Sequence, residues 1–312
     1  MSTLQILLLA TILVYLIGMV AIGAVLAKEN RTTDDFYLGG RKLGPFVTAM
    51  SAEASDMSSW LLMGLPGVAY LTGTADAAWT AIGLVIGTYV NWLLVAKRLR
   101  NYTHVCNNST TLPLFFSNRY RDEKRALSVI AAVLIIIFFV PYTASGFAAC
   151  GKLFANLFGL DYVPAMIISA IVIVAYTTLG GFLAASTTDF VQSIVMTLAI
   201  IVVFGFGITK VGSFEAVMAN AQSMAGYFSL TQTHDAATGT ALPYGILTIF
   251  SMLAWGLGYF GMPHVLLRFM AIEDVKKLKL SRRVATVWVV ISMFVAVFIG
   301  VVGNAMSKVG VI

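Results

Sequence analysis

Long apolar runs divide this chain, and they constrain its fold more than any other feature of the sequence. A run of about 20 apolar residues spans the hydrocarbon core of a bilayer as an α-helix. Only helices and closed barrels satisfy their backbone polar groups in lipid, and these runs are too long for barrel strands. We therefore expect an all-α membrane protein, a multi-span helical bundle that forms a single transmembrane domain over residues 1–312. The eight expected spans are 5–27, 46–71, 77–96, 126–149, 163–180, 189–209, 244–267 and 284–306.

The composition agrees with a membrane protein, because 59% of the residues are hydrophobic and only 11% are charged. Soluble proteins carry about 25% charged residues. The first run, 5–27, is too long for a signal peptide and lacks a basic leader, so we interpret it as a span. Cys106 and Cys150 lie far apart and outside any CxxC pair, which argues against a disulfide framework or a zinc site. The sequence shows no nucleophile–base set or phosphate loop, so we expect neither enzyme activity nor a cofactor.

The basic residues are concentrated in three of the segments that connect the spans. Segments 28–45, 97–125 and 268–283 hold 17 of the 20 Lys and Arg residues, whereas the connection 211–243 holds none. Basic segments stay in the cytoplasm, so we expect the N-terminus outside and the protein in the cell (plasma) membrane. The net charge of +6 then indicates contact with membrane lipid rather than nucleic acid. We interpret 28–45 as a polar loop and 97–125 as a loop that could include a short surface helix.

The second span contains two carboxylates, Glu53 and Asp56, and several serines. A charge at the centre of a spanning helix costs about 2.5–3.5 kcal/mol, so such residues face a cavity, a partner or an ion. The run Gly64–Gly67 contains a proline and predicts a break in the outer third of this helix. A broken helix offers free carbonyls that bind cations. The alternatives are a polar helix held by ordinary hydrogen bonds, and a Glu53 that approaches the cytoplasmic interface.

The seventh span contains three glycines and a proline within Trp255–His264. The glycines form a GxGxxG pattern, but no strand precedes them, so a dinucleotide site is excluded. We predict a second broken helix instead. Trp255 and Tyr259 are spaced i, i+4 on one helix face and could form a wall for a small solute. The alternatives are a helix-packing face and an interfacial aromatic belt.

Weaker patterns lie in other spans. Pro141 is expected to kink the fourth span, and Tyr142 is expected to point its hydroxyl into the bundle. Asp189 follows a glycine-containing stretch at the expected start of the sixth span, where we interpret it as an N-cap, and the alternative is a role in transport. Arg268 closes the seventh span, where anchoring at the interface explains it.

Three motifs, Tyr37–Arg41, Ser51–Gly67 and Trp255–His264, resemble the sodium:solute symporter family, and the resemblance runs along essentially the whole chain. It implies an inverted-repeat transporter (leucine-transporter-like) fold in which the first helix of each repeat is broken. It also implies sodium-coupled symport of L-proline into the cell by alternating access, with Na⁺ as the coupling ion. The alternatives are a symporter of another small solute, or a transport-inactive fragment or sensor with the same fold.

The resemblance also assigns residues to the two sites. It implies sodium binding by the backbone carbonyls of Ala54 and Met57, supported by the carboxylate of Asp56. It implies a proline pocket lined or shaped by Ser58, Tyr142, Trp255, Tyr259 and Pro263.

The sequence departs from this family pattern at three positions. Glu53 and Ser59 stand where the best-known relatives have glycine, and Met262 stands where they have glutamine. The extra carboxylate makes the cation preference of this chain a separate question. The family's remaining sodium ligands lie on a later helix, so we expect a transporter truncated after the eighth span, with a sodium site that is incomplete in this chain.

Overall fold

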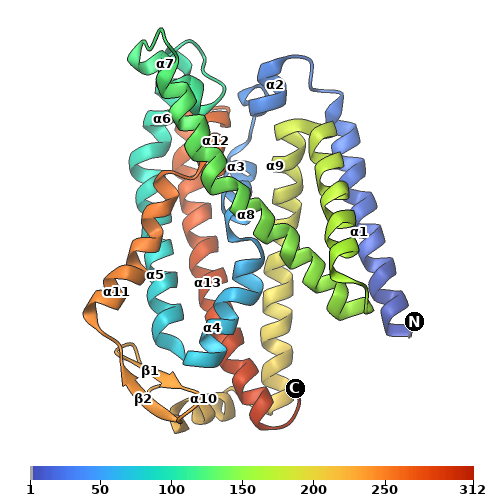
Figure 1. Cartoon of the computed structure of the whole chain (residues 1–312), viewed down its shortest axis with the longest axis vertical. Coiled ribbons are helices and arrows are strands. Elements are labelled where there is room, and N and C mark those ends of the chain that lie inside the picture. The colour runs from blue at the N-terminus through green and yellow to red at the C-terminus, as the bar shows by residue number, and fades with distance from the viewer. Residues whose placement is uncertain (1–2) are drawn as a thin grey trace. The chain divides into compact units, whose positions relative to one another are not determined.

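The computed structural model describes residues 3–312 and consists of helices with one short hairpin (Figure 1), which confirms the expected all-α fold. The α-helices are α1 (Thr3–Ala27), α2 (Thr33–Leu38), α3 (Pro45–Ser59), α4 (Leu65–Thr72), α5 (Thr74–Asn91), α6 (Lys97–Val105), α7 (Leu112–Tyr120), α8 (Ala126–Phe158), α9 (Tyr162–Val211), α10 (Phe214–Ser223), α11 (Ile246–Leu253), α12 (Pro263–Ala271) and α13 (Leu278–Lys308). Short 3₁₀ helices cover Gly39–Arg41, Ala254–Phe260 and Val275–Lys277, and π-helical turns cover Trp60–Gly64 and Trp92–Ala96. The strands β1 (Gln232–Asp235) and β2 (Thr240–Pro243) pair in antiparallel register.

Helix occupies each of the eight segments predicted to span the membrane. Within residues 3–312, five helical stretches are long and apolar enough to cross a bilayer, and a bent helix pair at 246–271 makes a sixth candidate. Two expected spans fall outside this set. The span 46–71 is polar and interrupted, and the helix under the span 163–180 has only a short apolar stretch, Tyr162–Ala175.

The chain folds into two compact units, each assembled from three separate stretches of sequence. Unit 1 comprises Met1–Ala52, Ala96–Val191 and Pro263–Leu278, and unit 2 comprises Glu53–Val95, Gln192–Met262 and Lys279–Ile312. In unit 1, α1 lies beside the first half of α9 (Figure 1), where the Asn30 amide donates to the Gly180 carbonyl at 2.9 Å. Gly181 then adopts φ 61° and ψ −161°, which kinks α9 between its two expected spans.

The basic connecting segments of unit 1 are more helical than the sequence suggested. Segment 28–45 contains α2, whose first turn is closed by a reciprocal capping box between Thr32 and Asp35. Segment 97–125 contains both α6 and α7. These polar stretches were interpreted mainly as loops because neither contains an apolar run long enough for a span.

Arg41 ties these connecting segments together. Its Nη1 donates to the Met270 carbonyl at 2.6 Å, and its Nη2 donates to the Ser109 carbonyl at 2.9 Å. Burial, with the nearby charge of Arg100, lowers the pKa of Arg41 to about 10, so the group remains a cation at neutral pH. One guanidinium group therefore fastens sequence segments that are far apart in the chain.

Unit 2 has its own apolar core where α10 packs against α13. Buried Val217 and Ala221 lie against Val301 and Ala305 there, together with the fully buried Tyr227. The Thr233 hydroxyl of β1 donates to the Thr72 carbonyl at 2.9 Å, which joins the β1–β2 hairpin to the end of α4. The hairpin was not predicted, because its strands carry little of the apolar alternation that marks a buried strand.

Candidate functional site

Helix α3 is broken at Ser58, which has φ 43° and ψ −154°. A π-helical turn, Trp60–Gly64, follows before α4 begins. Ala54 and Met57 therefore lie in the last turn of α3 before the break. The break comes earlier than the predicted run Gly64–Gly67, because Pro66 occupies the first turn of α4, where its missing N–H costs nothing.

A cluster of polar side chains surrounds this break within unit 2. Glu53 is 3% exposed, and Trp92 Nε1 donates to its Oε1 at 2.9 Å. The Asp56 carboxylate and the Thr88 hydroxyl adjoin Glu53, and the Tyr259 hydroxyl adjoins Asp56 and Thr88. Glu53 is thus turned into the protein, and its depth relative to the cytoplasmic interface stays a prediction.

The second predicted break is also present, but its geometry differs from the prediction. Residues Ala254–Phe260 form a 3₁₀ helix, which has three residues per turn, so the i, i+4 pair Trp255 and Tyr259 no longer shares a face. Tyr259 is 3% exposed, whereas Trp255 is 50% exposed and stacks on Trp60 with ring centroids 5.4 Å apart. Trp255 therefore stacks on Trp60 of the first broken segment and does not share a helix face with Tyr259, while a solute wall at these residues stays a prediction.

Close backbone packing positions Tyr259 in the cluster. A Cβ on Gly256 would collide with the backbone of Gly83, and a Cβ on Gly87 would collide with that of Gly256. Asn91 then donates its amide to the Tyr259 carbonyl at 2.9 Å. The glycine pattern that we excluded as a dinucleotide motif allows the segment 254–260 to lie directly against α5.

The remaining residues predicted for the proline pocket, Tyr142 and Pro263, belong to unit 1. Tyr142 stacks on His264 with centroids 5.5 Å apart and planes inclined by 22°, and Phe139 meets the same imidazole edge-on at 5.4 Å. Pro263 begins α12, immediately before this histidine. The structure thus gives Tyr142 an aromatic partner that the sequence did not reveal, while α8 continues through Pro141 to Phe158.

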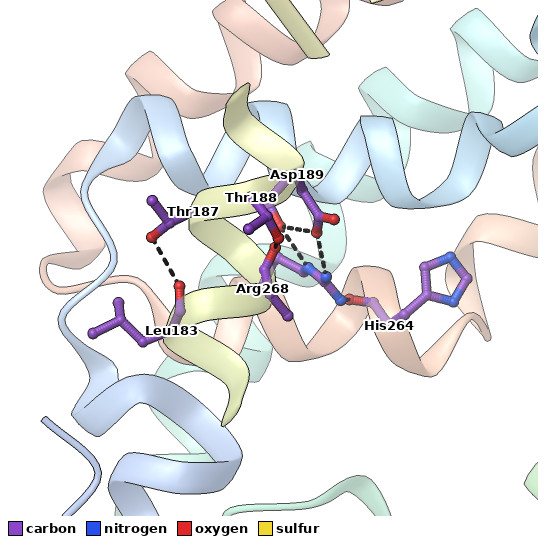
Figure 2. Close-up of polar contacts among 8 residues, drawn as sticks. Leu183, Thr187, Thr188, Asp189, His264 and Arg268 are labelled. Carbon is purple, nitrogen blue, oxygen red and sulfur yellow. Dashed lines mark hydrogen bonds and ion pairs between the residues drawn. The ribbon is translucent and has the colours of Figure 1, made fainter. Parts of the chain in front are cut away.

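A second polar cluster lies in unit 1 and is shown in Figure 2. Asp189 lies inside α9, so its interpretation as an N-cap is wrong. Arg268 is 6% exposed and donates from Nη2 to Asp189 Oδ2 at 2.8 Å, so anchoring at the membrane interface does not explain it. Ser51 accepts from Arg268 Nε at 2.9 Å and donates to Asp189 Oδ2 at 2.8 Å. The two charges neutralise each other inside the unit.

Sequence reasoning missed Thr88, Trp92 and His264. The first two are spaced i, i+4 within an apolar helical region, and this polar stripe was the available signal. Among the described residues, no group of three or more His, Cys, Asp or Glu side chains could hold a metal ion. Carboxylate and hydroxyl oxygens, such as those around Glu53, are hard ligands that suit hard cations better than soft transition metals.

A sequence profile of the sodium:solute symporter family matches residues 36–310. The chain belongs to this family. The chain is 45% identical over 295 residues to a sodium/proline symporter of Haemophilus influenzae. It is 42% identical over 297 residues to a sodium/proline symporter of Escherichia coli. It is also 42% identical over 292 residues to the osmoregulated proline transporter OpuE of Bacillus subtilis. These alignments cover 94–95% of this chain, which spans 57% of the length of each relative.

The fold agrees with this family assignment. The structure of a Na⁺-coupled sialic acid symporter in its substrate-bound, outward-open state matches this symporter-family chain with a TM-score of 0.79. The match covers 96% of this chain and 61% of that one, at 18% identity. The expected transporter fold is therefore confirmed, and the family and relatives are transporters rather than enzymes.

Proposed function

We propose that this chain carries out the sodium-coupled symport of L-proline into the cell by alternating access, as the part of a proline symporter that holds the broken helices. Its relatives at 42–45% identity are sodium/proline symporters and proline transporters. In this proposal Ala54, Asp56 and Met57 bind sodium. The proline pocket uses Ser58, Tyr142, Trp255, Tyr259 and Pro263.

The break in α3 at Ser58 is the observation that carries this proposal. It interrupts the helical geometry next to Asp56, and broken helices of this kind bind cations in transporters. A cation bound there neutralises Asp56, and the exposed Ser58 and Trp255 lie on the broken segments of the same unit. An ion and a solute that share one broken helix stabilise each other's binding, which is the requirement for coupling.

Proline uptake into vesicles tests this function. The chain is produced alone and, in parallel, fused to the C-terminal remainder of the Haemophilus influenzae relative. We expect the fusion to accumulate proline only with an inward sodium gradient. Accumulation of a different solute would change the substrate, and uptake by neither protein under any gradient would reject transport.

We propose further that the chain lies in the plasma membrane with its N-terminus outside and contacts lipid but no nucleic acid. The three basic segments, which contain α2, α6 and α7 among others, then face the cytoplasm. A reporter active only outside the cell should work when fused within 211–243 and fail within 97–125. The reverse result would contradict this orientation.

A further inference from the structure

Glu53 is the buried acidic group that the sites inferred from the family do not use. It is 3% exposed, and the neighbouring charge that acts on it is a second carboxylate, Asp56, rather than a cation. One neutral donor, Trp92 Nε1, bonds to its Oε1. A buried carboxylate normally has a basic partner or a bound cation, because its desolvation is otherwise too costly.

Two buried hydroxyl groups point to the same place. The Thr88 side chain lies beside Glu53, and the Tyr259 hydroxyl lies beside Asp56 and Thr88. Thr88 is 2% exposed and Tyr259 is 3% exposed, yet neither hydroxyl closes a hydrogen bond of standard geometry within the described residues. Buried polar atoms without partners are rare in folded proteins, and each one calls for an explanation.

The oxygens of two carboxylates and two hydroxyl groups converge in this cluster, and the Trp92 indole N–H donates to one of them, Glu53 Oε1. Hard monovalent cations bind to such sets of carboxylate and neutral oxygens at membrane depth. A bound monovalent cation would both balance carboxylate charge and give the hydroxyl oxygens of Thr88 and Tyr259 a partner.

We propose that Glu53, Asp56, Thr88 and Tyr259 form a sodium site made entirely of unit 2 side chains. It shares Asp56 with the site implied by the family, but it uses the side chains of Glu53, Thr88 and Tyr259 in place of that site's backbone carbonyls and ligands from a later helix. It rests on the proposed function only in the choice of sodium as the ion. The site is complete within residues 53–259 and binds sodium without proline.

Equilibrium binding of radioactive sodium to the purified 312-residue chain in detergent, without proline, tests the site. We expect saturable binding that Glu53→Gln weakens by at least about tenfold. Thr88→Val should weaken it by a smaller factor, since a neutral ligand is lost and the fold keeps a residue of similar shape. Trp92 supplies a second readout: its fluorescence should respond to sodium, and Glu53→Gln should abolish the response.

Glu273→Gln is the matched control, because this exposed carboxylate pairs with Lys277 outside the cluster. It should bind sodium like the wild type. Equal sodium affinity in wild type and Glu53→Gln, or no sodium binding to the wild type, would overturn the site and leave Glu53 as a protonated partner of Trp92. Sodium-driven proline uptake is scored separately, so each proposal can fail without the other.

Discussion

Each unit holds an acidic side chain among its helices, Asp189 partly buried and Glu53 buried, and the two have different neighbours. In unit 1, Asp189 is paired with Arg268, and Ser51 bonds to both. In unit 2, Glu53 receives an indole N–H and has another carboxylate for its neighbouring charge. Unit 1 therefore carries its own counter-ion, whereas unit 2 takes one from solution. The comparison separates a structural acid from a ligand-binding acid inside one chain.

The largest expected effect comes from removing the counter-ion of unit 1. Arg268→Met leaves Asp189 buried without its partner, which should lower the free energy of unfolding by about 3–5 kcal/mol. Thermal unfolding of the purified protein measures this loss. The double variant Arg268→Met, Asp189→Leu should recover most of the stability, because replacing a whole buried ion pair by apolar groups is often neutral. A single variant that unfolds at the wild-type temperature would show that the pair does not hold unit 1 together.

The next effect concerns the packing that positions Tyr259 in unit 2. Gly256→Ala pushes a methyl group into the backbone of Gly83, and overpacking of this kind costs about 1–3 kcal/mol. Gly258→Ala is the matched control, since a Cβ there meets no heavy atom within 4 Å. Thermal unfolding should separate the two variants. Equal stability would mean that close approach of the backbones does not position Tyr259.

A smaller effect is expected on ion affinity in unit 2. Asp56→Asn, placed in the fusion protein described above, should raise the sodium concentration for half-maximal proline uptake by at least about tenfold, or about 1.4 kcal/mol. The cause is the loss of an ionised group that favours a cation at membrane depth. Uptake measured over a range of sodium concentrations checks this. An unchanged sodium dependence would remove Asp56 from the ion site.

The smallest effect concerns Asp35, an exposed acid whose main partner is the neutral hydroxyl of Thr32. Asp35 is exposed, and its bond with Thr32 holds the pKa of its carboxyl below 3.8. The folded pKa is thus below the unfolded one, so the capping contribution is present above about pH 4 and is lost as the pH falls through the folded value. Hydrogen exchange of α2 should accelerate in that acid range. Thr32→Ala should remove most of this pH dependence, and an unchanged profile would rule out the capping box as its cause.

The sequence predicted the helices and the two broken segments, because hydropathy and the placement of glycine and proline are local signals. It misplaced the first break, because Pro66 is compatible with a helix start and Ser58 has no sequence signature of positive φ. It misread Asp189 because Arg268 lies 79 residues away, and no local pattern reports such a pair. Contacts between residues far apart in the chain were therefore the part of the site that could not be predicted from the sequence.

The guanidinium group of Arg41 has a consequence for the synthesis of the protein. Its shortest hydrogen bond goes to the carbonyl of Met270, which follows it by 229 residues. Domains are completed as the ribosome delivers their sequence, N-terminal parts first. Unit 1 takes its first stretch from the N-terminal end of this sequence, yet its last stretch, Pro263–Leu278, is made only after most of unit 2. A nascent chain that stops before Met270 leaves Arg41 without this carbonyl, so the residue reports whether translation has gone far enough to finish the unit.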